Sequence, residues 1–228
     1  MKHFKALLFM AVGLILGFSS CLDNENTDGR YYDFSAYMTI PGDFAMTGRV
    51  ITDNDITLYV RNTSAVAYQD GSYPERIYAY VKVLGEEFDT TNPKDRYAVQ
   101  IVEGYVSPII TVNMNTRPDT LEHHSVHKIP NLWAGNGYLN IPFIMYTQNN
   151  PPLTSVNAFI DRASHDTLFV KFSNGTTGSN LVENIFSFRL LPSMIEASGV
   201  TPNDGKIIIN VTSACDEDAI KGNCQYQL

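Results

Sequence analysis

Apolar and polar residues alternate with a period of two along most of this chain, and this pattern constrains the fold more than any other feature. Ile56, Leu58 and Val60 alternate with Thr57, Tyr59 and Arg61, and the segment 77–83 repeats the pattern. Successive side chains of a β-strand point to opposite faces, whereas a helix repeats about every 3.6 residues. The alternation therefore predicts strands that each bury one face in a core.

The first half of the chain holds about five such segments, which is enough to close a small barrel. The triplet Asp53-Asn54-Asp55 separates two of them as a hairpin turn would. The connection 86–96 is polar and contains Pro93, so we expect a loop there. The predicted strands cover residues 37–40, 48–52, 56–60, 77–83 and one long run, 97–112.

The alternation lapses over residues 113–130, and we place a domain boundary there. We assign residues 37–117 to the barrel and residues 118–228 to a second domain. Short strands separated by Gly, Asn and Pro turns predict a β-sandwich for that domain. Residues 194–197 are compatible with one helical turn. The predicted strands cover residues 138–145, 156–160, 168–172, 186–190, 207–211 and 225–228.

The N-terminal segment has the pattern of a lipoprotein signal peptide. Lys2 and Lys5 precede an apolar run, 6–18, that is shorter than the roughly 20 residues of a membrane-spanning helix. Small residues then precede Cys21, so we expect cleavage after residue 20 and lipidation of the Cys21 thiol. Two or more acyl chains hold a protein firmly on a bilayer. An ordinary signal peptide with a chance cysteine is the alternative.

Residues 21–36 form the predicted tether, which is polar and acidic in its first part. Asp23, Glu25 and Asp28 resemble the signal that exports some lipoproteins of diderm bacteria to the outer leaflet of the outer membrane. We therefore expect an outer-membrane protein that is anchored by lipid and exposed on the surface. A periplasm-facing position is the alternative.

The charge of the mature chain argues against a nucleic-acid partner. Removal of residues 1–20 takes away Lys2 and Lys5 and no acidic residue, so the formal net charge falls from −8 to −10. Binding to phosphates requires a basic surface. Nucleic acid is therefore excluded as an expected partner.

Only two cysteines, Cys215 and Cys224, follow the lipidation site. Disulfides persist outside the cytoplasm, so we expect this pair to be bonded and to pin the last hairpin. A loop of this length predicts a stabilisation of about 2.5–3 kcal/mol. Two free thiols are the alternative.

One face of the predicted barrel carries aromatic and basic residues that could bind a ligand. These residues are Tyr59, Arg61, Tyr78, Tyr80 and Lys82. Aromatic rings on such a face offer flat apolar area against which sugars and peptides can stack. The alternative is that tyrosine is simply favoured on strands and that the second domain covers this face.

Trp133 has two interpretations as well. As the only tryptophan, beside glycines at the start of the second domain, it is either a plug in the core or between the domains, or a platform for a ligand.

No residue pattern predicts catalysis or a cofactor. Residues 122–127 contain Glu122 and three histidines, but their spacing suits neither a strand nor a helix that chelates a metal, and a solvated linker explains them. No nucleophile elbow and no zinc-protease motif is present. We therefore expect neither an enzyme nor a metal or cofactor site.

The order of these features resembles the NigD-like lipoproteins. The resemblance is carried by the lipidation motif and acidic tether, by Trp133 with the surrounding residues 132–141, and by the segments 166–170 and 186–188. It implies an all-β fold in which an OB-like five-stranded barrel is followed by a β-sandwich. It implies fold and location far more than mechanism, because the family name comes from an association with bacteriocin gene clusters and no biochemical activity is established for the family in general.

The expected function is that of a non-catalytic binding or interaction module of the cell envelope, with a peptide, protein or glycan as ligand. Self-protection against a bacteriocin and a structural role in the envelope are the alternatives. The membrane would be contacted through the lipid on Cys21.

Overall fold

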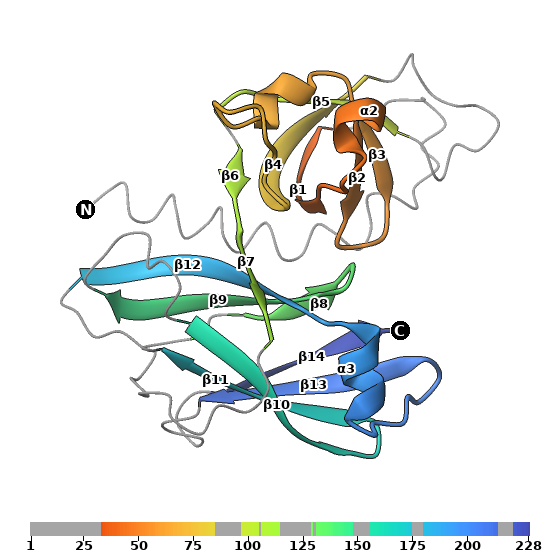
Figure 1. Cartoon of the computed structure of the whole chain (residues 1–228), viewed down its shortest axis with the longest axis vertical. Helices are drawn as coiled ribbons and strands as arrows, with labels where there is room; N and C mark the ends of the chain where they lie inside the picture. Colours follow the sequence, from red (N-terminus) through yellow and green to blue (C-terminus); the bar gives the residue numbers. More distant parts are fainter. Residues whose placement is uncertain are drawn as a thin grey trace.

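The computed structural model describes residues 33–84, 97–104, 106–114, 129, 131–147, 156–174, 180–213 and 221–228. They form two β-rich domains, with the first domain above the second in Figure 1. The expected all-β fold is confirmed: an OB-like barrel precedes a β-sandwich. The signal peptide and most of the tether lie outside the described residues. Within those residues, no helix has the length and apolarity needed to cross a bilayer.

The first domain is a closed barrel of five strands in the order β1-β2-β3-β5-β4, closed by pairing of β4 with β1. The pair β3 and β5 is parallel and the others are antiparallel. This order is that of an OB-like barrel. The elements are β1 (Phe34–Thr39), α2 (Phe44–Thr47), β2 (Arg49–Thr52), β3 (Thr57–Val60), the 3-10 helix η1 (Thr63–Val66), β4 (Arg76–Val83), β5 (Tyr97–Ile101) and β6 (Ser107–Pro108).

The barrel core follows the alternation of the sequence. Leu58 and Val60 of β3 are buried, as are the residues of the same phase on β4, Ile77, Ala79 and Val81. The predicted hairpin turn at 53–55 is confirmed, because the Asp55 N–H donates to the Thr52 carbonyl at 3.0 Å. The barrel therefore forms as the binary pattern predicts.

The predicted long strand 97–112 is wrong, because the chain breaks twice within it. Gly104 has a positive φ of 88°, which turns the chain after β5, and Pro108 has no N–H to continue a ladder. The last part, β7 (Ile110–Asn113), pairs in parallel with β12 (Asn180–Arg189) of the second domain. The change from barrel to sandwich thus falls before Ile110, and Figure 1 shows β6 and β7 running from one domain to the other.

The second domain packs two four-stranded sheets, β7-β12-β9-β8 and β10-β11-β13-β14. Aromatic residues of both sheets meet between them: Phe143 of β9 lies 4.9 Å from Phe172 of β11, centroid to centroid. The predicted strands and the helical turn are confirmed. The elements are β8 (Trp133–Gly135), β9 (Tyr138–Thr147), β10 (Val156–Ser164), β11 (Thr167–Asn174), α3 (Pro192–Ala197), β13 (Lys206–Ser213) and β14 (Lys221–Gln227).

The short strand β8 is not among the sequence-based predictions. Its hairpin with β9 turns through Asn136 and Gly137, which both have positive φ (44° and 79°). Gly135 and Tyr138, the residues that flank this turn, pair with each other. Two turn residues with positive φ form a type I′ turn, for which Asn-Gly is the preferred pair. The Asn-Gly dipeptide was the available signal for this hairpin.

Candidate functional site: a buried polar seam between the domains

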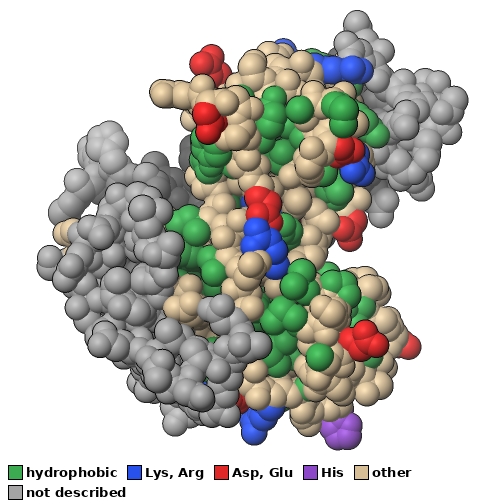
Figure 2. Space-filling view, in the orientation of Figure 1, with side chains coloured by type: hydrophobic (Ala, Val, Ile, Leu, Met, Phe, Trp, Pro, Cys, Tyr) green, Lys and Arg blue, Asp and Glu red, His purple; other side chains and the backbone are tan. Residues whose placement is uncertain are grey.

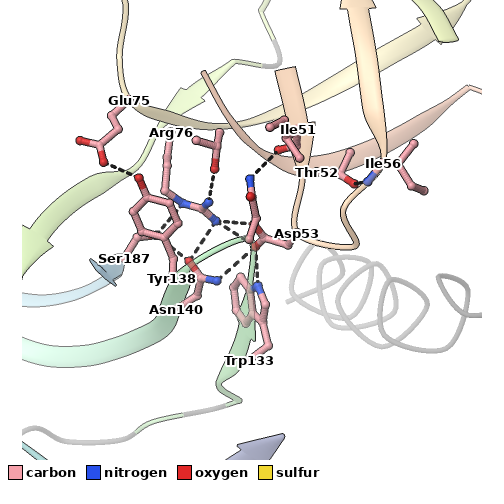
Figure 3. A network of polar contacts seen from close by, with 12 residues as sticks. Ile51, Thr52, Asp53, Ile56, Glu75, Arg76, Trp133, Tyr138, Asn140 and Ser187 are labelled. Carbon is pink, nitrogen blue, oxygen red and sulfur yellow. Dashed lines mark hydrogen bonds and ion pairs between the residues drawn. The ribbon is translucent and has the colours of Figure 1, made fainter. Parts of the chain in front are cut away.

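The barrel and the sandwich meet through a network of polar side chains, shown in Figure 3. From the barrel, Arg76 begins β4 and Asp53 begins the turn between β2 and β3. From the sandwich, Asn140 lies on β9 and Ser187 on β12, directly opposite each other in the sheet. We call these four residues, together with Trp133, the interdomain seam.

Arg76 is the centre of the seam and is completely buried. Its Nη2 donates to both carboxylate oxygens of Asp53 at 2.7 and 2.9 Å and to Asn140 Oδ1 at 3.1 Å. Its Nε donates to Ser187 Oγ at 3.0 Å and its Nη1 to Thr39 Oγ1 at 2.7 Å. Burial of a guanidinium is tolerated only when its donors are satisfied, and each nitrogen of Arg76 has a partner.

Asp53 accepts hydrogen bonds from both domains. Trp133 Nε1 donates to its Oδ2 at 2.8 Å and Asn140 Nδ2 donates to the same oxygen at 3.1 Å. Burial raises the pKa of the Asp53 carboxyl above its ordinary value, against the opposing effects of the Arg76 charge and the Trp133 hydrogen bond. The carboxylate thus ties two sandwich strands, β8 and β9, to the barrel.

A second ion pair borders the seam. Arg189 at the end of β12 donates through Nε to Glu75 Oε1 at 2.8 Å and through Nη2 to Glu75 Oε2. Tyr138 and Thr111 also donate to this carboxylate. Burial by itself would raise the pKa of the Glu75 carboxyl. The hydrogen bonds from Arg189, Tyr138 and Thr111 together outweigh this effect and hold the pKa below its ordinary value. Both side chains are about one-third exposed, so this pair lies at the rim.

Tyr138 connects the two ion pairs. Its ring lies under Arg76, with the guanidinium carbon 4.3 Å from the ring centroid, while its hydroxyl donates to Glu75. A cation above an aromatic face is attracted by the ring quadrupole. Burial and the Glu75 hydrogen bond raise the pKa of Tyr138 to about 12, so the phenol stays protonated as a donor.

Gly135 allows the domains to approach this closely. A Cβ at this position would lie 2.3 Å from the Asp53 carbonyl oxygen and 2.8 Å from the Asp53 Cβ. Both contacts are shorter than atoms tolerate, and the oxygen belongs to the backbone. Gly135, two residues after Trp133, is therefore required by the contact between β8 and the β2–β3 turn.

Aromatic rings extend the seam toward the barrel surface. The Tyr37 ring lies between those of Tyr78 and Trp133, with a centroid distance of 4.6 Å to each. Burial, and then the neighbouring Tyr78 and Asp53, raise the pKa of Tyr37 to about 12. The interpretation of Trp133 as a plug between the domains is confirmed by its ring contact and by its bond to Asp53.

The five predicted ligand-binding residues share an outward phase but do not lie side by side. Tyr78 packs on Tyr37 next to the seam. Tyr59 is half-buried and pairs with Ala98 of β5, the strand that separates β3 from β4. The remaining three are Tyr80, half-buried, with its hydroxyl donating to Asp33 at 3.4 Å, and the exposed Arg61 and Lys82. Ligand binding by these residues stays a prediction.

The structure does not show the predicted disulfide. Cys224 carries a free thiol and packs half-buried against the sandwich core, and burial raises the pKa of this thiol to about 12. Its neighbour across the hairpin is Ile209, a buried core residue, and so its side chain points between the sheets and does not flank the turn. Cys215 lies outside the described residues, as do Cys21 and the histidine cluster at 122–127.

The face of the molecule shown in Figure 2 does not gather charge of one sign. Figure 2 shows acidic and basic side chains scattered over both domains on the face it presents. Within the described ranges, no three His, Cys, Asp or Glu side chains are grouped so that they could hold a metal ion.

The fold and the seam define a class of all-β proteins in which an OB-like barrel is docked on a β-sandwich. Neither a known family model nor a curated protein matches the sequence. Solved structures do match over most of the chain. A protein of unknown function from Bacteroides vulgatus has a TM-score of 0.58 at 19% identity, covering 86% of this chain and 91% of its own.

Two further structures carry more informative names. A candidate lipoprotein from Bacteroides fragilis is 11% identical with a TM-score of 0.54, covering 87% of this chain and 99% of its own. A NigD-like immunity protein from Bacteroides caccae is 17% identical with a TM-score of 0.51, again covering 87% and 99%. The resemblance to NigD-like proteins is therefore confirmed as a likeness of fold.

Proposed function

We propose that this protein is a non-catalytic binding module of the cell envelope, anchored by lipid on Cys21 in the outer membrane and exposed on the surface. The observation that carries the binding role is the difference between the two ends of β4. Arg76 at one end is locked into the seam, whereas Lys82 at the other end is exposed on an open pocket of the barrel. A barrel held firmly on a second domain presents that pocket in a fixed orientation.

The lipid anchor is supported by the sequence around Cys21 and by the likeness to the candidate lipoprotein from Bacteroides fragilis. Labelled palmitate should enter the wild-type protein and should not enter the Cys21→Ala variant. Equal labelling of both proteins would contradict the anchor. Digestion of intact cells with an added protease tests surface exposure, because a periplasm-facing protein would survive.

The binding role is tested on the barrel face. The Tyr80→Ala and Lys82→Ala variants should lose capture of a ligand from a panel of peptides and glycans, while their melting temperatures change little. We chose these two residues because Tyr78 also packs beside the seam, and its loss would change stability. Retention of every captured ligand by both variants would contradict a binding role for this face.

Self-protection against a bacteriocin is the second candidate function. It is supported by the likeness to the NigD-like immunity protein from Bacteroides caccae. A deletion strain should then become sensitive to a bacteriocin encoded beside the gene, and the wild-type gene should restore resistance. Unchanged sensitivity would remove this candidate and leave the binding module in place.

A further inference from the structure

An open pocket of about 460 Å³ lies on the barrel between η1 and the strands β4 and β5. Of its lining residues, Ile101 is buried, and Asn62, Ala65 and Val102 are half-buried. Small-molecule sites commonly measure about 300–1,000 Å³. The pocket therefore has room for a small ligand or for one unit of a larger one.

One wall of the pocket is held in place by Asn62. Its Nδ2 donates to the Ile101 carbonyl at 2.7 Å, and its Oδ1 accepts from the Ile101 N–H at 2.9 Å, as a neighbouring strand would. The Arg61 N–H adds a bond to the Val99 carbonyl at 3.0 Å. The segment that carries η1 is thus fixed on β5, and a preformed site avoids the cost of ordering on binding.

The exposed lining residues offer both hydrogen-bond donors and hydrogen-bond acceptors, some charged and some neutral. Lys82 contributes an ammonium, Glu103 a carboxylate, Gln100 an amide and Ser64 a hydroxyl. One positive and one negative charge cancel, so the pocket has no net charge that would select an ion. Charge pairs at exposed positions are also weak. Matching of hydrogen bonds, and not net charge, then determines which ligand fits.

Tyr80 is not itself a lining residue of the pocket, but its backbone lies next to two residues that are, Lys82 and Val102. Tyr80 is two residues before Lys82 on β4 and so shares its face, and its carbonyl accepts from the N–H of the lining residue Val102 at 3.0 Å. An aromatic face provides flat apolar area. A sugar ring carries hydroxyls at its edge and C–H groups on its face, so it can use a polar pocket and an adjacent ring together.

We propose that this pocket binds an uncharged saccharide unit. Lys82 and Gln100 donate hydrogen bonds to its hydroxyls, Glu103 accepts from them, and the ring of Tyr80 packs beside it. The proposal rests on the binding function proposed above and names the ligand class of that surface.

The test uses the full lipidated chain in a polyoxyethylene detergent, because glucoside and maltoside detergents carry the sugars in question. The probes are the methyl glycosides of glucose, galactose, mannose and N-acetylglucosamine, with the zwitterionic dipeptide Ala-Ala for comparison. Saturation-transfer NMR should show saturable binding of at least one glycoside, with a dissociation constant on the order of 1 mM. Absence of saturable glycoside binding would overturn the proposal.

A double variant locates the site. Lys82→Ala with Gln100→Ala should weaken glycoside binding at least tenfold. The matched control, Lys206→Ala with Gln225→Ala, removes the same residue types from exposed strand positions of the sandwich and should bind as the wild type does. Equal glycoside binding by the double variant and the wild type would overturn the assignment to this pocket.

The outcomes separate this proposal from the one it rests on. Saturable binding of Ala-Ala with none of any glycoside would overturn the saccharide class, while the binding function of the barrel would stand. A failure of palmitate to label Cys21 would remove the anchor and would leave the result for the pocket unchanged.

Discussion

Arg76 and Lys82 lie on the same face of one strand, yet their surroundings are opposite. Arg76 at the start of β4 is completely buried against the sandwich, and Lys82 near the end of β4 is exposed. Alternation decides on which side of a strand a residue lies, and it places both outside the barrel core. It does not decide whether another domain covers that side. The difference is made by the docking of the two domains.

The docking of the domains also buries polar residues of the sandwich. Asn140 and Ser187 lie between buried core residues of their strands and point away from that core, but the barrel covers them completely. These two polar side chains point away from the sandwich core, and they are buried because the barrel packs against that side of the sheet. Their hydrogen bonds to one another and to Arg76 offset the cost of their burial.

The largest effect is expected at the buried ion pair. Arg76→Ala would leave the Asp53 carboxylate buried without its cation, and loss of one partner of a buried pair costs about 3–5 kcal/mol. Urea unfolding of the full chain should measure this loss. The control is Arg49→Ala, which breaks a pair with Asp43 whose side chains are both 37% exposed and should cost about 1 kcal/mol or less. Equal losses in the two variants would contradict the importance of the seam.

The next effect concerns the approach of the two domains. Gly135→Ala would place a methyl group against the Asp53 backbone, and such overpacking costs about 1–3 kcal/mol. Gly42→Ala is the control, since a Cβ there meets nothing within 4 Å. Thermal unfolding should show a lower melting temperature for the first variant only. A Gly135→Ala protein as stable as the Gly42→Ala protein would mean that the contact is looser than described.

A smaller effect distinguishes Tyr78 from the rest of the predicted ligand face. Tyr78→Ala removes its ring contact with Tyr37, and an aromatic pair contributes about 0.5–1.5 kcal/mol beyond its buried area. Tyr78→Phe keeps the ring and should unfold at nearly the wild-type urea concentration. If the alanine variant were as stable as the phenylalanine variant, Tyr78 would belong with the exposed face and not beside the seam.

The smallest effect is a dependence on pH at the rim pair. The Glu75 carboxyl has a pKa below its ordinary value of 4.5, so its stabilising contribution is present above pH 4.5 and is lost as the pH falls through the folded-state pKa. The wild type should be more stable than Glu75→Gln at pH 6, and this difference should shrink toward pH 3. Urea unfolding at both pH values checks it. A difference that grew on acidification would reverse the assigned direction.

Most of the fold could be predicted because it is local. The alternation in 56–60 and 77–83 places two of the barrel strands, and Asp53-Asn54-Asp55 marks the hairpin between β2 and β3. The strand β8 is too short to show alternation, and only its Asn-Gly turn signals it. The run 97–112 looks continuous in hydrophobicity, but a glycine turn and a proline divide it.

The seam could be predicted only in part. Trp133 beside glycines suggested a contact between domains, and the structure gives it a partner in Asp53. Nothing near Arg76 in the sequence indicates that it bonds to Asn140 and Ser187, because those contacts depend on how two complete domains dock. Likewise, the spacing of two cysteines could not reveal that Cys224 points into the sandwich core.

The central claim is that the seam joins barrel and sandwich into one cooperative unit. Differential scanning calorimetry of the full chain tests it most directly. We expect one transition for the wild type, with equal calorimetric and van't Hoff enthalpies, and two separate transitions for Arg76→Ala. Two resolved transitions in the wild type itself, unchanged by Arg76→Ala, would contradict the claim.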